Sequence, residues 1–188
     1  MKFSIAERKA ERKADAKRVR REGNIPAVLY SKGRSPHHIA LKKEEFQAVL
    51  RNLKPGMLST MVFELHNGKT TQKALIKEVQ YQPATYEVEH IDFLELREDV
   101  PVTVKVPILV VGAAECVGVK LGGMMHQIIR SLQVVCLPKD IPHELTIDVT
   151  EMNVADSKTL ADLKIPAHVR PLAKLTEVLV TIAKKVVA

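Results

Sequence analysis

Two runs of residues typical of β-strands flank Asn67-Gly68, and this pattern constrains the fold strongly. Residues 61–66 precede the pair and residues 69–78 follow it. An Asn-Gly connection favours a type I′ turn, because both residues adopt left-handed dihedral angles at low cost. The sequence therefore predicts a β-hairpin whose second strand continues to Gln80 and ends before Pro83.

More strands and one helix are predicted around this hairpin. Residues 25–30 indicate a buried strand that ends at the turn of residues 31–33, and Pro26 is tolerable near its start. Residues 38–41 and 86–94 indicate two further strands. Between them, residues 43–52 predict a helix, since Phe46 is followed by apolar residues at helical spacing.

The second half of the chain reads as strand after strand. Residues 97–101 combine charges with a proline, so we expect a boundary that gives two domains, 1–97 and 98–188. Strands are predicted at the following residues: 102–110, with Pro107 typical of an edge strand or bulge, then 128–137, 145–149 and 175–183. Glycines predict loops at 112–123, and 156–163 predicts a polar turn followed by an ambiguous segment. The fold class is mainly β with some α.

The whole net charge lies at one end of the chain. Residues 1–35 contain eleven Lys and Arg against four Asp and Glu, whereas the remaining residues contain eighteen of each. Read as a helix, residues 8–21 place lysines on one face and alanines on the opposite one. Because such a helix has few bulky apolar residues, packing alone does not hold it, and binding to a polyanion can.

Three interpretations of the charged segment remain open. It can be a solvated helix without a partner, a membrane-surface helix or a nucleic-acid contact. Alanine is a weak membrane anchor, which disfavours the second. The arginines at 18, 20 and 21 favour the third, since guanidinium groups bind phosphate in a bidentate way. Aromatic residues make up only 4% of the chain, which favours contacts to a folded nucleic acid over stacking on single strands.

Composition argues against several other classes of protein. No apolar run approaches twenty residues, and the N-terminus lacks the apolar region of a secretory signal, so we expect no membrane span and a cytoplasmic location. Cys116 and Cys136 have neither metal-ligand spacing nor a disulfide framework around them. Both are predicted to be small core residues.

His90 and Asp92 share one face of the strand predicted at 86–94, and Ile91 and Phe93 share the other. A catalytic role lacks a nucleophile at recognisable spacing. An exposed pair without function and a pair that recognises bases both remain open. Near phosphates, the carboxylate of Asp92 has a use only as an acceptor for base amino groups, while His90 can donate or stack.

Three segments together resemble one family. These segments are residues 17–20 (KRVR), residues 24–30 (NIPAVLY), and Val79-Gln80 followed by residues 90–93 (HIDF). In this order the chain resembles bacterial large-subunit ribosomal protein twenty-five, in its long form of the general stress protein CTC type. Residues 118–123, 132–142 and 147–149 resemble the C-terminal β domain of the long form.

The resemblance implies an N-terminal six-stranded β-barrel with helices, followed by a C-terminal β domain. It implies that the protein binds 5S rRNA, lies in the ribosome beside other large-subunit proteins, and is not an enzyme. It implies no cofactor, no metal, no membrane and no small-molecule substrate. The RNA-binding residues carried over are Arg8, Lys13, Lys17, Arg18, Arg20, Tyr30, His90 and Asp92, with Arg21 and Gln80 as weaker matches.

The sequence departs from the family at residues 12–16. Family members often have a glycine-rich segment there, whereas this chain has RKADA, in which the backbone approaches phosphate less closely and Asp15 repels it. Family architecture also begins with a strand, so we expect residues 2–8 to be extended and 14–22 helical. The alternative function is a protein-binding or ribosome-assembly and stress module, whose β second half is the working surface and whose basic arm binds polyanions generically.

Overall fold

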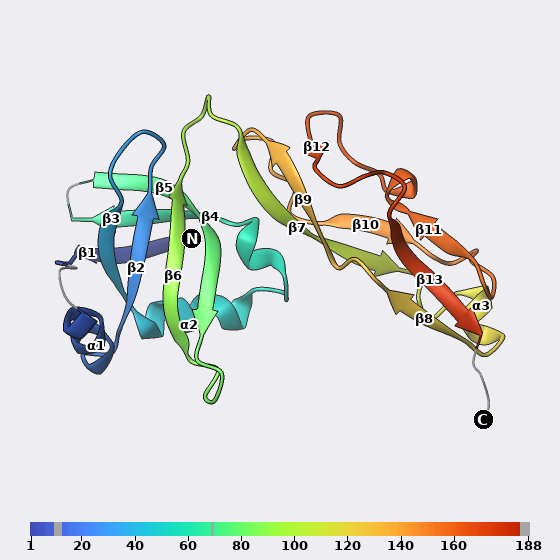
Figure 1. The fold of residues 1–188 in the computed structure, drawn as a ribbon, viewed down its shortest axis with the longest axis horizontal. Coiled ribbons are helices and arrows are strands. Elements are labelled where there is room, and N and C mark those ends of the chain that lie inside the picture. Colours follow the sequence, from blue (N-terminus) through green and yellow to red (C-terminus); the bar gives the residue numbers. More distant parts are fainter. Residues whose placement is uncertain (10–12, 69, 185–188) are drawn as a thin grey trace. The chain divides into compact units, whose positions relative to one another are not determined.

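The computed structural model describes residues 1–9, 13–68 and 70–184 (Figure 1). Its contacts divide the chain into two compact units, Met1–Val100 and Pro101–Ala188. The domains 1–97 and 98–188 stay a prediction, because a division into compact units does not test independent folding.

Six strands form a closed barrel in the first unit, which confirms the predicted fold class. The strands are β1 (Lys2–Glu7), β2 (Asn24–Tyr30), β3 (His37–Lys42), β4 (Val62–Asn67), β5 (Thr70–Tyr81) and β6 (Val88–Glu95). Their order is β1-β3-β2-β6-β5-β4, and β4 returns to pair with β1. The β1–β4 and β2–β6 pairs are parallel, and the other four are antiparallel.

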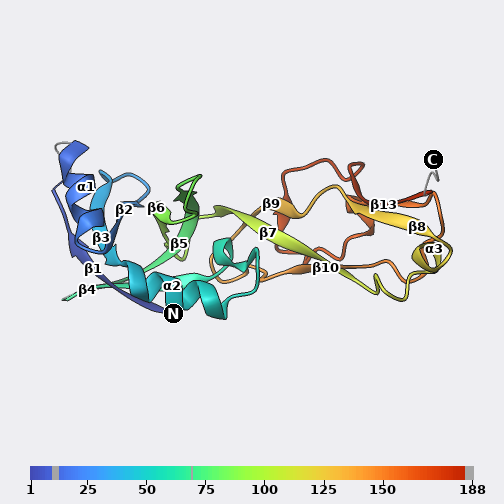
Figure 2. The same ribbon diagram turned by 90° about the horizontal axis from the view of Figure 1, so that it is seen from below.

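The barrel encloses an aromatic core. All four phenylalanines of the chain are buried in it, and Phe3 of β1 lies at its centre, with its ring centroid 5.1 Å from that of Phe63, 6.0 Å from that of Phe46 and 6.4 Å from that of Phe93. Phe46 comes from α2 (Lys43–Asn52), which has the predicted bounds and covers one end of the barrel (Figures 1 and 2). A short 3₁₀ helix, η1 (Met57–Ser59), follows it.

The N-terminal segment differs from the helix read at residues 8–21. Arg8 and Lys9 precede α1 (Lys13–Arg21), and residues 10–12 lie outside the described residues. The residues before α1 form a strand because apolar side chains alternate along them, and Phe3 and Ile5 of β1 pack toward the core. The backbone N–H of Arg8 then donates to the carbonyl of His38 at 3.0 Å, which prolongs the ladder with β3. The strand and helix expected from the resemblance are close to those observed.

The β4–β5 hairpin is confirmed, but its turn begins one residue later than predicted. Asn67 belongs to β4, pairs with Thr70, and donates from Nδ2 to Oε1 of Glu7 at 2.8 Å. Gly68 adopts a φ of 59°. The left-handed position thus falls on glycine, which adopts it at lower cost than asparagine. At β6, the strand begins two residues after the predicted start at Tyr86, which has a φ of 54°.

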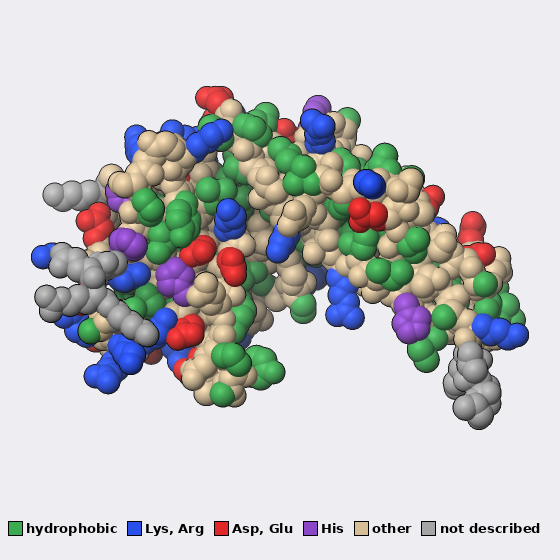
Figure 3. All heavy atoms as spheres, in the orientation of Figure 1, with side chains coloured by type: hydrophobic (Ala, Val, Ile, Leu, Met, Phe, Trp, Pro, Cys, Tyr) green, Lys and Arg blue, Asp and Glu red, His purple; other side chains and the backbone are tan. Residues whose placement is uncertain are grey.

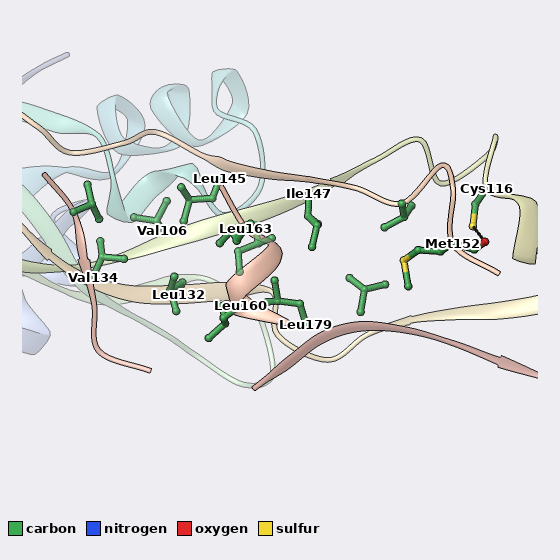
Figure 4. Close-up of a cluster of buried hydrophobic side chains, with 14 of the residues drawn as sticks. Val106, Cys116, Leu132, Val134, Leu145, Ile147, Met152, Leu160, Leu163 and Leu179 are labelled. Atoms are coloured by element: carbon green, nitrogen blue, oxygen red, sulfur yellow. Dashed lines mark hydrogen bonds between the residues drawn. The ribbon is translucent and has the colours of Figure 1, made fainter. Parts of the chain in front are cut away.

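The second unit contains two further sheets, of order β10-β7-β9-β12 and β11-β13-β8. Its elements are β7 (Val102–Val111), α3 (Val117–Lys120), β8 (Gly123–Gln127), β9 (Ser131–Cys136), β10 (Leu145–Asp148), β11 (Ser157–Thr159), η2 (Leu160–Asp162), β12 (Arg170–Pro171) and β13 (Val178–Lys184). Aliphatic side chains from both sheets form its core (Figure 4). Cys116 and Cys136 are free and buried there, as predicted, and the thiol of Cys116 donates to the carbonyl of Met152 at 3.4 Å.

The strand predicted at residues 128–137 is wrong in its first part. The backbone N–H groups of Ile128 and Ile129 both donate to the carbonyl of Leu179, at 2.8 and 3.4 Å, whereas the carbonyl of Arg130 accepts from Ile108. These residues carry the chain from β8, which pairs with β13, to β9, which pairs with β7. An apolar run therefore covers a crossing between sheets rather than one strand.

Three other predictions for the second unit need correction. The loop expected at 112–123 contains the one-turn helix α3 and the start of β8. The last strand begins at Val178, because the N–H of Glu177 closes a turn on the carbonyl of Lys174 at 3.0 Å. Pro107 does not mark an edge, since β7 lies between β10 and β9; it stands where the pairing with β9 ends and that with β10 begins.

Candidate nucleic-acid interface

The outer face of strands β2, β6 and β5 carries the polar residues predicted to contact RNA. Side chains alternate along β6, so Ile91 and Phe93 are buried while His90 and Asp92 face outward. Asp92 lies opposite Val28 of β2, and His90 lies opposite Gln80 of β5. Pairing register, which links strands distant in sequence, thus brings these residues onto one surface.

His90 and Asp92 contact each other on this face. Nδ1 of His90 lies 3.1 Å from Oδ1 of Asp92, and the two side chains are 21% and 20% exposed. Oδ1 is shielded from solvent, and Nδ1 of His90 is the basic nitrogen that lies against it. The pair is therefore preorganised, with the imidazole orientation set by the carboxylate.

Two arginines from different segments act on His90. Burial lowers the pKa of His90 most strongly; the negative charge of Asp92 raises it, and the positive charges of Arg8 and Arg20 lower it further, so the net direction is downward. The imidazole is consequently neutral near pH 7. With its proton on Nδ1 toward Asp92, its Nε2 is left as a hydrogen-bond acceptor.

Arg8 is held by the barrel rather than by the helix. Its Nε donates to the carbonyl of Ile39 at 3.1 Å, and burial lowers its pKa, with the charge of Asp15 opposing this and that of Arg20 adding to it. Arg20 comes from α1, where its Nη1 lies 2.9 Å from Oε1 of Glu89. The first strand and the first helix thus each bring a guanidinium group near His90.

The rest of α1 presents cations to solvent. Lys17, Arg18 and Arg21 are exposed and line a surface hollow with Ala14 and Asp15. Lys and Arg side chains gather over this helix in Figure 3. Since α1 packs against β2, its cations border the face that carries Asp92.

The structure places the remaining predicted residues as follows. Tyr30 is 39% exposed at the end of β2, so its side chain is an exception to the burial predicted for the strand of residues 25–30. Gln80 is exposed on β5. Lys13 opens α1, and the departure from the family pattern at residues 12–16 falls partly outside the described residues.

Glu89 is a site residue that sequence reasoning missed. It precedes His90, and its partner Arg20 lies 69 positions away in the sequence. No local pattern signals a contact of that kind, because it depends on the packing of α1 against β2, from which Arg20 reaches Glu89 of β6.

Within the described part of the chain, no three His, Cys, Asp or Glu residues are grouped as a metal site requires. Across residues 1–9, 13–68 and 70–184, no helix has the length and apolar character needed to span a membrane.

Comparison with known proteins identifies the family. Residues 4–93 match the Ribosomal L25p family, and residues 101–186 match the family described as ribosomal protein TL5, C-terminal domain. Full-length relatives decide the matter, because one from Chlamydia abortus is 42% identical over 185 residues, which cover 98% of this chain and 100% of the relative. The chain belongs to the bL25 family of ribosomal proteins.

Other bL25 proteins match over the same length. A relative from Chlamydia pneumoniae is 42% identical and one from Chlamydia trachomatis serovar D is 40% identical, each over 98% of this chain and 100% of the relative. All three are named large ribosomal subunit protein bL25. The family resemblance drawn from the sequence is confirmed, and so is the prediction that the chain belongs to a non-enzymatic family.

Proposed function

We propose that this protein is a structural constituent of the large ribosomal subunit that binds 5S rRNA through α1 and the outer face of β2, β6 and β5. Membership of the bL25 family supports the ribosomal role. That 5S rRNA is the RNA bound is proposed in addition to this ribosomal role. The proposed contact residues are Arg8, Lys13, Lys17, Arg18, Arg20, Arg21, Tyr30, Gln80, His90 and Asp92.

One observation carries the proposal: two acceptors stand among cations on a single surface. Asp92 and the neutral His90 form a contacting pair, and the charges of Arg8 and Arg20 act on His90. Phosphates bind guanidinium groups, but they repel a carboxylate. Base amino groups and 2′-hydroxyls donate hydrogen bonds, so they suit Asp92 and Nε2 of His90.

This arrangement matches the demands of a folded RNA. In A-form helices the wide minor groove displays 2′-hydroxyls and base edges between two rows of phosphates. The exposed cations of α1 suit the phosphates and supply affinity without sequence information. The acceptor pair supplies the discrimination that a charged helix lacks.

The test is equilibrium binding of the full chain to 5S rRNA and to a structured transcript of equal length. We expect clear preference for 5S rRNA, and we expect Asp92→Ala to weaken that binding by roughly 1–3 kcal/mol. Equal affinity for both transcripts would contradict the proposal.

Glu78→Ala is the matched control. Glu78 lies directly opposite Asp92 in the ladder and is also an exposed carboxylate. If carboxylates on this face do nothing but repel phosphate, both substitutions tighten binding. If Asp92 accepts hydrogen bonds from RNA, Asp92→Ala alone weakens it.

A further inference from the structure

Helix α1 is weakly held by packing. It contains nine residues, and Val19 is the one buried side chain among those described in it. Isolated helices of this length are marginally stable in water, because the free-energy cost of nucleation exceeds the stabilisation from the hydrogen bonds of a few turns. Its position beside the barrel therefore depends on polar contacts as well as on Val19.

Arg20 supplies such a contact by reaching a single residue of β6 in two ways. Its Nη1 lies 2.9 Å from Oε1 of Glu89, and its Nε donates to the backbone carbonyl of the same residue at 3.1 Å. The two side chains are 36% and 45% exposed. Two donors of one planar group aimed at one residue fix the direction of the side chain, which a lysine cannot do.

Neighbouring acids are used differently. Glu22 lies 3.9 Å from Arg18 four residues earlier, so this contact remains local to the end of α1. Glu87 lies 2.7 Å from Nζ of Lys43, which belongs to α2. Glu89 instead joins α1 to the strand that carries the acceptor pair, and it directly precedes His90 in the chain.

We propose that Glu89 is a positioning residue for RNA binding, which holds α1 on β6 through Arg20 so that Lys17, Arg18 and Arg21 are preorganised beside His90 and Asp92. This inference rests on the proposed 5S rRNA function. Arg20, named above among the predicted RNA contacts, is thereby assigned a different role, because it acts through Glu89 and does not neutralise a phosphate. A helix already held in place loses less conformational freedom when RNA binds, which favours affinity.

If Glu89 positions α1, removing it changes RNA affinity in the opposite direction from that expected from charge alone. A carboxylate beside a polyanion repels it, so removing Glu89 tightens binding if charge alone matters. If Glu89 positions α1, its removal weakens binding in spite of the more favourable net charge.

The experiment compares Glu89→Ala with Glu87→Ala, which removes an equal charge two residues away but breaks a contact to α2. We expect Glu89→Ala to weaken 5S rRNA binding about two- to fivefold, the range for a lost surface ion pair, and Glu87→Ala to leave it unchanged or tighter. In the free protein, amide hydrogen exchange of residues 13–21 should accelerate in Glu89→Ala alone. Tighter binding by Glu89→Ala, or an equal effect of both variants, overturns the inference.

Arg20→Ala separates positioning from phosphate contact. We expect it to weaken binding with an unchanged salt slope, and to add nothing further in combination with Glu89→Ala. Arg21→Ala, by contrast, should make the slope shallower by about 0.7–0.9. A slope change of that size in Arg20→Ala refutes the positioning role.

Two kinds of failure remain distinguishable. If the unaltered chain does not prefer 5S rRNA, the proposed function fails, whatever the variants do. Unchanged exchange of α1 in Glu89→Ala shows instead that Glu89 does not hold the helix, even where 5S rRNA binding is intact.

Discussion

The three exposed cations of α1 make a quantitative prediction about salt. Each phosphate neutralised by a protein releases counterions and contributes about −0.7 to −0.9 to the slope of log affinity against log salt. Lys17, Arg18 and Arg21 are all solvent-exposed. The guanidinium group of Arg18 lies 3.9 Å from Glu22, and it remains accessible to a phosphate. Replacing all three with glutamine should therefore make the slope shallower by about 2 to 2.7.

The consequence for affinity is large. Over a fourfold rise in salt, these three contacts account for a roughly 20- to 40-fold loss of affinity in the unaltered protein, and the triple variant lacks that part of the loss. Glutamine is a good helix former, so the substitutions leave the propensity of α1 nearly intact. The assay is equilibrium binding to 5S rRNA at a series of salt concentrations.

The second unit offers a control with the same change in net charge. Lys120, Lys164 and Lys174 are exposed there, and replacing them with glutamine removes three positive charges far from α1 in the sequence. We expect the slope to stay as in the unaltered protein. An equal reduction by both triple variants would refute the assignment of the phosphate contacts to α1, since overall charge alone would then govern binding.

Three further predictions concern stability. Phe3→Ala should lower the free energy of unfolding of the first unit by about 3–5 kcal/mol and leave the second unit unaffected in denaturant titrations, because Phe3 is 1% exposed at the centre of the aromatic core; a loss below about 1 kcal/mol would contradict the packing described. Burial lowers the pKa of His90, so the unfolded chain takes up this proton at a higher pH than the folded chain; the associated stability is complete above the ordinary value of 6.5 and is lost as pH falls below it. His90→Gln should reduce that acid-side loss in unfolding measured at several pH values, and an undiminished pH dependence would show that other groups cause it. Gly118→Ala should destabilise the second unit alone, by about 1–3 kcal/mol in denaturant titrations, because the added Cβ would lie 2.8 Å from the backbone carbon of Asn153; unchanged stability would show that this close approach relaxes freely.

Local patterns in the sequence predicted the elements whose cause is local. The apolar positions of α2 lie at helical spacing, and those of β6 alternate, so both were identified. At residues 8–21, local pattern alone does not predict where the helix begins. Its composition suits a helix from Arg8 onward, but Phe3 and Ile5 bind the preceding residues into the barrel, and the ladder with β3 continues to the N–H of Arg8. Tertiary pairing overrides helix propensity at that point.

Prolines illustrate the same limit. A proline within a strand suggests an edge, because it lacks a donor for one neighbour. Pro26 and Pro107 nevertheless lie in strands with neighbours on both sides. Each precedes by one residue the start of a parallel pairing, β2 with β6 at Ala27 and β7 with β10 at Ile108. The missing N–H thus falls one residue before the strand gains its parallel neighbour, which only the register of distant segments reveals.

Acidic residues in β6 and directly before it explain why net charge alone does not describe the surface proposed to bind RNA. Glu87, Glu89 and Asp92 each contact a nitrogen of a basic side chain, from Lys43, Arg20 and His90 respectively. Lys17 and Arg21 form no ion pair with any described residue. The three acids therefore hold α1, α2 and the neutral imidazole through direct contacts, and the exposed cations of α1 stay available for a polyanion. Acidic and basic residues that offset each other in the net charge thus have separate roles. The acids order the surface, and the exposed cations of α1 are available for binding.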